Sequence, residues 1–194
     1  MSKIIKINGM EDVILVDEND NQIGTMDKME AHLKPFLHRA FSVFLVNNNN
    51  MLIQKRAVEK YHSGGLWANS CCSHPRANRD FMDSVYDRLR FELGIEEKIK
   101  LEELFKFVYL SKYNDNLYEH EYDHVLLGQI EDYDFKFNKE EIAEMKWVDI
   151  SWLKKDINEH KEKYAAWFQM CAPKVIDYLE NKRWVQINVT VLIF

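Results

Sequence analysis

The chain has 194 residues, of which 46% are hydrophobic and 30% are charged, a composition typical of one globular domain. Its formal net charge of −6 argues against a nucleic acid or an anionic membrane as the partner, because both require a broad basic surface. A small anionic ligand stays possible, since a few local Lys and Arg side chains suffice to bind it.

The ends of the chain show no targeting or membrane-spanning pattern. Residues 1–20 lack the apolar core of a signal peptide, and no run approaches the roughly 20 apolar residues of a membrane span. The three cysteines, an odd number, indicate free thiols in a reducing compartment. We therefore expect a cytoplasmic protein, and we expect it to act as a monomer.

No low-complexity linker or internal repeat divides the sequence. We expect a single domain over 1–194, with its core at about 11–182 and a tail at 183–194 that has no assigned role. We expect that tail to be either an added strand or a non-native extension.

The first half of the chain is rich in strand patterns. Residues 13–16 form a short apolar run, and the turn residues 18–21 precede Ile23. Residues 38–46, HRAFSVFLV, and residues 51–56 predict two strands around an Asn-rich turn. Further strands are predicted at 104–110, 125–130 and 146–150.

Helical spacing follows in three places. Met82, Val85, Leu89 and Leu93 recur at helical intervals, and Gly94 stands where a C-terminal cap is expected.

Ser151 is the expected N-cap of a second helix. Apolar residues from Tyr164 to Tyr178 predict a last helix, kinked or interrupted at Pro173. Strands interleaved with helices in this way predict an α/β (α+β) fold with a mixed sheet between helices.

The segment His120-Glu121-Tyr122-Asp123-His124 matches H-E-x-x-H, a zinc-peptidase signature that requires a helix. Its neighbours are aromatic or apolar over a strand-like length, which favours a strand. In a strand the period is two, so Glu119, Glu121 and Asp123 share one face, and His120 and His124 share the other.

A carboxylate pair on one strand face can bind a metal ion together with histidines from distant loops. His32 and His38, six residues apart, and His74 are candidates. Such a mixed N/O site suits Zn²⁺, Mn²⁺ or Fe²⁺. Arg88 and Glu92 share one helix face and could form an ion pair there.

Six short segments occur in a specific order, and their spacing resembles that of type 1 isopentenyl diphosphate isomerases, enzymes with a Nudix-like fold. The similarity runs from about residue 13 to about residue 167. The segments are KMEAH (28–32), HRAFSVFLV (38–46), QKRAVEK (54–60), WANSCCSHP (67–75), RLRFELG (88–94) and EHEYD (119–123).

The resemblance implies the interconversion of isopentenyl and dimethylallyl diphosphate through a tertiary carbocation, in isoprenoid biosynthesis. It implies catalytic roles for Cys72, Glu121, Tyr109 and Trp167. It further implies a Zn²⁺ or Mn²⁺ site formed by His32, His38, His74, Glu119 and Glu121. A Mg²⁺ ion would be bound by Glu92 and the diphosphate, and Lys28, Arg56, Lys60 and Arg88 would bind the diphosphate.

A Nudix-type pyrophosphohydrolase is the alternative function. The hydrolase box is R-E-u-x-E-E-x-G-u, where u is aliphatic, and residues 87–95, DRLRFELGI, retain only one of its glutamates, at Glu92. This loss disfavours hydrolysis. We expect the remaining conspicuous side chains to be structural, with Cys171, Trp147 and Trp152 in the core and His62 and His160 at the surface.

Overall fold

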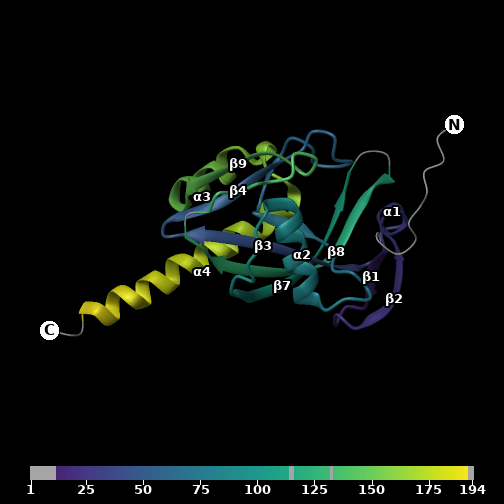
Figure 1. The fold of residues 1–194 in the computed structure, drawn as a ribbon, viewed down its shortest axis with the longest axis horizontal. Coiled ribbons are helices and arrows are strands. Elements are labelled where there is room, and N and C mark those ends of the chain that lie inside the picture. Colours follow the sequence, from purple (N-terminus) through teal and green to yellow (C-terminus); the bar gives the residue numbers. More distant parts are fainter. Residues whose placement is uncertain (1–11, 114–115, 132, 192–194) are drawn as a thin grey trace.

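A computed structural model describes residues 12–113, 116–131 and 133–191, with the backbone alone for 183–191 (Figure 1). Within these residues nine strands form one sheet. The strands are β1 (Asp12–Val16), β2 (Gln22–Asp27), β3 (His38–Asn47), β4 (Asn50–Arg56), β5 (Trp67–Ala68), β6 (Cys71–Ser73), β7 (Leu101–Lys112), β8 (Tyr118–Gln129) and β9 (Ile142–Asp149). The helices are α1 (Lys28–Leu33), α2 (Phe81–Leu93), α3 (Ile150–Glu159), α4 (Ala166–Val191) and the short 3₁₀ helix η2 (Lys161–Lys163).

Strand β3 lies at the centre of the sheet. It pairs antiparallel with β1, β4 and β6, and parallel with β8. Strand β7 continues the sheet beyond β8, and β9 continues it beyond β4. Side chains of β3 alternate between two hydrophobic cores, with Val43 and Leu45 in one and Phe44 and Val46 in the other. The apolar run at 38–46 is nearly continuous because both faces of this strand are buried.

Helices cover both faces of the sheet (Figure 1). On one face α2 buries Val85 and Leu89 against β3, and on the other α3 and α4 bury Leu153 and Phe168. The predicted mixed sheet between helices is therefore confirmed.

Helix boundaries follow from their caps. The Asp80 carboxylate accepts hydrogen bonds from the backbone N–H groups at the start of α2, and Gly94 ends this helix at φ +72°, as its position predicted. The prediction of Ser151 as the cap of α3 was wrong. Asp149 caps it instead, because its carboxylate accepts from the Trp152 N–H at 2.9 Å, so the helix begins earlier.

Helix α4 contains Pro173 without interruption, in contrast to one of the two predicted outcomes. Proline in a helix interior costs about 3 kcal/mol, but Phe168, Cys171, Val175 and Ile176 pack this helix into the core, which offsets that cost. The backbone of 183–191 continues α4, so the added strand expected as one possibility does not form there, while 192–194 lie outside the described residues. Among the described helices, none is long and apolar enough to cross a membrane.

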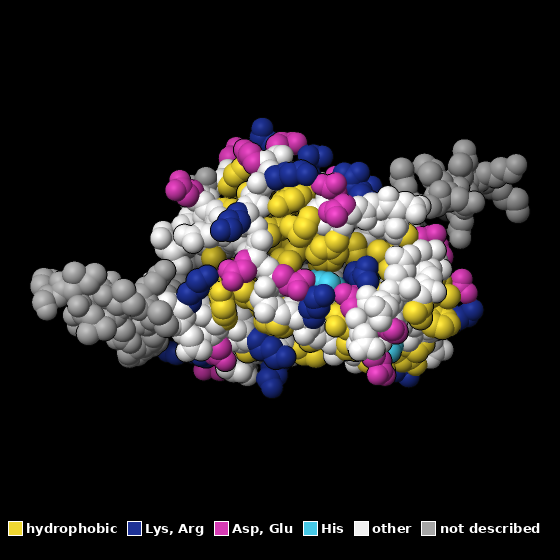
Figure 2. All heavy atoms as spheres, turned by 90° about the horizontal axis from the view of Figure 1, so that it is seen from below, with side chains coloured by type: hydrophobic (Ala, Val, Ile, Leu, Met, Phe, Trp, Pro, Cys, Tyr) yellow, Lys and Arg dark blue, Asp and Glu magenta, His cyan; other side chains and the backbone are white. Residues whose placement is uncertain are grey.

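Charged side chains of both signs are interspersed on the face of the molecule drawn in Figure 2, around a patch of hydrophobic side chains. The described side chains of this face do not form the broad basic surface that a nucleic acid would require.

Candidate active site

Strand β8 contains the H-E-x-x-H segment, so the helical interpretation, and with it a zinc peptidase, is wrong. The strand period turns Glu119 and Glu121 to one buried face. His120 and His124 lie on the other: His120 contacts the Pro35 carbonyl at 2.8 Å, and His124 is held by carboxylates outside the site.

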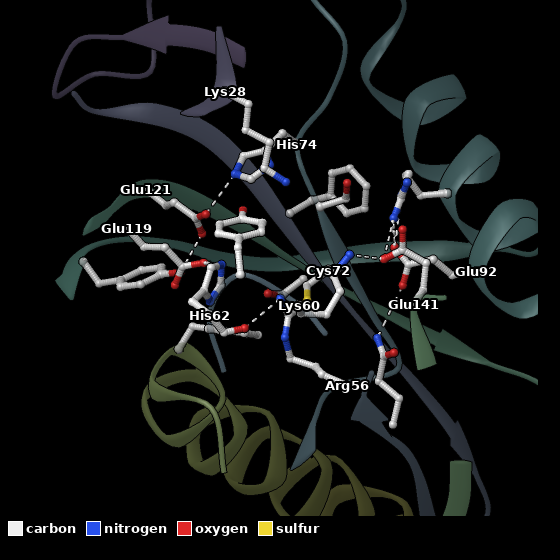
Figure 3. Close-up of a pocket in the computed structure, with 18 residues that line it drawn as sticks. Lys28, Arg56, Lys60, His62, Cys72, His74, Glu92, Glu119, Glu121 and Glu141 are labelled. Carbon is white, nitrogen blue, oxygen red and sulfur yellow. Dashed lines mark hydrogen bonds and ion pairs between the residues drawn. The ribbon is translucent and has the colours of Figure 1, made fainter. Parts of the chain in front are cut away.

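A pocket with roughly 550 Å³ of empty volume collects side chains from most elements of the sheet and from α1, α2 and α4. Figure 3 shows Glu119 and Glu121 with His62 and His74 at one end, Glu92 and Glu141 at the other, and Cys72 between them. The pocket thus has two carboxylate-containing ends separated by a thiol.

The first end contains a cluster of four possible metal ligands, His32, His38, His74 and Glu121, whose ligand atoms lie within 4.8 Å of one another. His38 Nε2 lies 3.2 Å from His74 Nε2, and His74 Nε2 lies 2.9 Å from Glu121 Oε1. His32 comes from α1, His38 from the start of β3 and His74 from the residue after β6. The resemblance had named all four residues.

The hydrogen bonds of two histidines show that the cluster fits a divalent ion. His32 Nδ1 donates to the Lys28 carbonyl at 2.6 Å, and His38 Nδ1 donates to the Phe36 carbonyl at 2.8 Å. Both Nε2 atoms therefore carry free lone pairs directed into the cluster. His32 Nε2 is buried without a hydrogen-bond partner in the structure, and a metal ion would satisfy it.

Glu119 occupies a neighbouring group rather than the first cluster. A carboxylate oxygen of Glu119 lies within 4.8 Å of ring nitrogens of His32 and His62. From the sequence we expected His62 to lie at the surface. That prediction was wrong: His62 is buried, and its Nε2 donates to Glu119 Oε1 at 2.9 Å. Tyr113 donates to Glu119 Oε2 at 2.8 Å. The sequence carried no local signal for either contact.

The two carboxylates of β8 have opposite electrostatic environments. Burial and the neighbouring charge of Glu119 raise the pKa of Glu121. Burial also opposes ionisation of Glu119, but the hydrogen bond and charge of His62 and the hydrogen bond from Tyr113 outweigh it and lower its pKa to about 2. Of the pair, Glu119 is therefore the stronger acid, and Glu121 is the better proton acceptor.

Tyr109 of β7 links the pair. Its hydroxyl lies 2.6 Å from Glu121 Oε2 and 3.1 Å from Glu119 Oε2. Burial and these carboxylates raise the pKa of Tyr109 well above its usual range, so its hydroxyl keeps its proton. Tyr109 and Glu121 therefore form a buried proton-holding pair at the pocket wall.

The two adjacent cysteines of β6 point in opposite directions, as strand geometry requires. Cys71 is buried in the core under α2, whereas Cys72 lines the pocket. Burial raises the pKa of the Cys72 thiol to about 12, although the Arg56 guanidinium, whose Nη1 lies 3.8 Å from Sγ, opposes this. The thiol is therefore protonated at neutral pH.

The other end of the pocket combines cations with carboxylates. Arg88 donates to Glu92 Oε1 from Nε at 3.0 Å, and Lys60 Nζ lies 2.5 Å from Glu141 Oε2. Lys28 also lines the pocket. Glu141, which precedes β9, was not predicted, because nothing in its local sequence distinguishes it from other surface glutamates.

Arg56 and Trp167 meet at the pocket wall. The Arg56 guanidinium carbon lies 5.2 Å from the centre of the Trp167 ring, and the buried Arg56 Nε has no hydrogen-bond partner in the structure. The Trp167 indole N–H donates to Asn69 Oδ1 at 2.9 Å, which fixes the ring. Trp167 is thus packed in the core, and it also lines the pocket.

The remaining structural predictions had mixed outcomes. Cys171 is buried and His160 is partly exposed, as expected. Trp147 is partly buried against the core. The core prediction for Trp152 was wrong, because this side chain on α3 is 45% exposed.

Gly64 lies in the loop that carries Lys60 and His62 into the pocket, and Gly64→Ala is expected to destabilise the protein. An added Cβ would lie 2.3 Å from the Val58 carbonyl oxygen, a backbone atom that no side-chain rotation can move away. Such overpacking costs about 1–3 kcal/mol, or several degrees of Tm, and thermal unfolding followed by circular dichroism measures it. Gly24→Ala is the control, since its Cβ would meet Leu15 at 4.0 Å, and an equal loss in both variants would contradict the account.

Comparison with known proteins agrees with this architecture. A Nudix domain matches residues 36–168. A protein of Deinococcus radiodurans, DR0079, superposes with a TM-score of 0.69 at 18% identity over 84% of this chain and 98% of that chain. A MutT protein from Methanosarcina mazei has a TM-score of 0.58 at 17% identity over 75% of this chain and 96% of that chain. At sequence identities this low, the similarity to these two proteins concerns the fold alone. The fold and the matched domain place the chain in the Nudix class.

Proteins similar in sequence indicate which family within the Nudix class the chain belongs to. Isopentenyl-diphosphate Delta-isomerase 1 of Aromatoleum aromaticum is 46% identical over 90% of this chain and 98% of its own length. Isopentenyl-diphosphate Delta-isomerase 2 of the same organism is 45% identical over 86% and 88% of the two chains. An enzyme of that name from Photorhabdus laumondii is 39% identical over 91% and 98%. The chain belongs to the isopentenyl-diphosphate Delta-isomerase family.

Proposed function

We propose that this protein interconverts isopentenyl diphosphate and dimethylallyl diphosphate. One observation carries the proposal: the Cys72 thiol and the hydrogen-bonded pair of Tyr109 and Glu121 line the same pocket. The family membership supports the substrate. The reaction requires an acid that protonates one carbon and a base that takes a proton from another.

The reaction adds a proton to the terminal carbon of the 3,4 double bond and removes one from carbon 2. A tertiary carbocation at carbon 3 connects the two steps. Because an alkene is a weak base, the acid must be held against it in a site that excludes water. We infer that Tyr109 Oη, hydrogen-bonded to Glu121 Oε2, and Cys72 Sγ are the two proton-transfer atoms. One of them donates its proton to carbon 4, and the other, in its deprotonated form, accepts the proton from carbon 2.

Trp167 is suited to stabilise the carbocation. A π face attracts a cation without offering a nucleophile that would trap it. In this structure Trp167 lines the pocket, and the Arg56 guanidinium carbon lies 5.2 Å from the centre of its ring. We infer that the hydrocarbon part of the substrate lies beside this ring.

Four cationic side chains would bind the diphosphate. Arg56 has a free, buried Nε, and Arg88 and Lys60 are held in place by Glu92 and Glu141. Lys28 completes the set on the α1 side of the pocket. These local charges explain how a chain of net charge −6 would bind an anion.

Two divalent ions fit the donor groups. His32, His38, His74, Glu119 and Glu121 would hold Zn²⁺ or Mn²⁺, and Glu92 would hold Mg²⁺ with the diphosphate oxygens, together with the Cys72 carbonyl. When bound, these ions supply positive charge that acidifies the groups around them and neutralises the diphosphate.

Removal of divalent ions is therefore expected to abolish activity. Treatment with a chelator should lower the rate of isomerisation to background, because the three clustered imidazoles and Glu121 then lack the charge that organises them. Addition of Mg²⁺ together with Zn²⁺ or Mn²⁺ should restore it, and product formation measures both steps. Full activity in the chelated protein, with ion removal verified by elemental analysis, would contradict the metal sites.

A pyrophosphohydrolase is the alternative that the Nudix fold supports. It would release phosphate or pyrophosphate, whereas an isomerase leaves the diphosphate intact. Phosphorus NMR of the reaction mixture separates the two, and we expect an intact diphosphate throughout. Release of free phosphate from isopentenyl diphosphate would favour the hydrolase.

We further infer one catalytic domain that acts as a monomer in the cytoplasm on a small allylic or homoallylic diphosphate. Cys71, Cys72 and Cys171 are all free, which supports a reducing compartment.

A further inference from the structure

His62 is buried at 7% exposure beside the proposed metal centre, yet none of the roles inferred above belongs to it. Its Nε2 lies 2.9 Å from Glu119 Oε1, and its Nδ1 lies 3.3 Å from the Ser63 hydroxyl. The Nε2–H donates to the carboxylate, and the hydroxyl can either accept from a protonated Nδ1 or donate to a bare one. Both ring nitrogens therefore have a partner.

The surroundings of His62 hold its ring in one orientation. The ring packs against Tyr113 with 4.8 Å between centroids, and it meets Tyr61 and Trp167 edge-on at 4.4 and 5.9 Å. The Arg56 guanidinium donates to the His62 carbonyl at 3.4 Å, which also fixes the backbone. Aromatic packing and a backbone contact together leave the imidazole little rotational freedom.

Glu119 depends on His62 for one of its two oxygens. Oε2 accepts a hydrogen bond from Tyr113 and lies 3.1 Å from the Tyr109 hydroxyl, whereas the described contact of Oε1 is with His62. Each carboxylate oxygen has two lone pairs, so the His62 N–H can occupy one and leave the other for a ligand. Glu119, His62 and His32 bring their ligand atoms within 4.8 Å of one another, and the Nε2 of His32 is the unpartnered atom.

We propose that His62 is a positioning residue of the metal centre, where its Nε2–H directs the Glu119 carboxylate toward the ion bound by His32. The inference rests on the proposed function, because it takes the clustered histidines and glutamates as a metal site. Without this donor, Glu119 would be held from the Tyr109 and Tyr113 side alone. Hydrogen bonds to metal-binding side chains typically change metal affinity by about 10- to 100-fold.

The test compares His62→Ala and His62→Gln in the full-length, metal-stripped protein. Gln places an amide N–H where the imidazole Nε2 was, so it retains the donor. Zn²⁺ affinity is measured by competition with a chromophoric chelator, and the visible spectrum of the Co²⁺-loaded protein reports the ligand geometry. His160→Ala is the control, because His160 is a partly exposed histidine that does not line the pocket.

We expect His62→Ala to lower Zn²⁺ affinity by about 10- to 100-fold and to change the Co²⁺ spectrum, and we expect His62→Gln to recover most of the affinity. Affinity within twofold of wild type in His62→Ala would overturn the proposal. An equal loss in His62→Gln, with its fold verified by circular dichroism, would also overturn it, because the donor is still present. Failure of the wild-type protein to bind Zn²⁺ or Co²⁺ would instead overturn the metal centre of the proposed function, and this inference with it.

Discussion

Replacement of Cys72 with alanine is expected to lower kcat for the conversion of isopentenyl diphosphate by about 1,000-fold or more. The thiol lines the pocket and is protonated at neutral pH, and alanine has no proton to exchange. KM should change little, because the diphosphate would be bound by the cationic side chains and not by the thiol. Steady-state kinetics with product detection measures both constants.

The adjacent cysteine is a matched control for this variant. Cys71 is fully buried in the core under α2 and does not line the pocket. Cys71→Ala should cost about 1 kcal/mol of stability and retain most of the activity. Activity that survives in Cys72→Ala, or is lost equally in both variants, would argue against the thiol as a proton-transfer group.

Glu121→Gln is expected to lower kcat by about 100- to 10,000-fold and to weaken the binding of a divalent ion. The substitution keeps the shape of the side chain but removes its charge and its capacity to exchange a proton. It disrupts two short contacts, to Tyr109 at 2.6 Å and to His74 at 2.9 Å. Kinetics and metal content together measure the effect.

Asp123 offers the control for Glu121, because it is a buried carboxyl on the same face of β8, two residues further along. Burial and the Glu121 charge raise its pKa well above the usual range, so it is neutral and Asn is a close mimic. Its Oδ2 accepts from the Ser42 hydroxyl at 2.8 Å, and it does not line the pocket. Asp123→Asn should remain active, and a loss equal to that of Glu121→Gln would indicate a general effect on the strand.

Local sequence patterns predicted those parts of the fold that depend on neighbouring residues. The alternation in residues 119–123 placed Glu119 and Glu121 on one face, and β8 has this arrangement. The spacing of Val85, Leu89 and Leu93 predicted α2 with its Gly94 end. Such periodicity follows from which face of an element is buried, and it is visible within a single segment.

Contacts between distant segments could not be predicted in this way. His62 is buried because the loop at 57–66 packs over the β7–β8 hairpin, where Tyr113 and Glu119 lie. Glu141 joins the pocket because β9 pairs with β4 and places it beside Lys60. In both cases the sequence offered an ordinary polar residue in a turn.

The family resemblance named most of the clustered residues but not how they group. It assigned Glu119 to one metal site with His38 and His74, whereas the structure groups Glu119 with His62 and His32. This difference depends on how the two oxygens of the Glu119 carboxylate are oriented. Their contacts with Tyr109, Tyr113 and His62 determine that orientation. Hydrogen-bond geometry of this kind has no signature in residue spacing.

Proton NMR of isopentenyl diphosphate in D₂O with the metal-loaded protein tests the central claim most directly. The account predicts that the signals of the terminal =CH₂ group disappear, that the dimethylallyl signals appear, and that a methyl group of the product carries deuterium from the solvent. Unchanged =CH₂ signals with release of phosphate or pyrophosphate would contradict it, as would an unchanged substrate in the presence of verified bound metal.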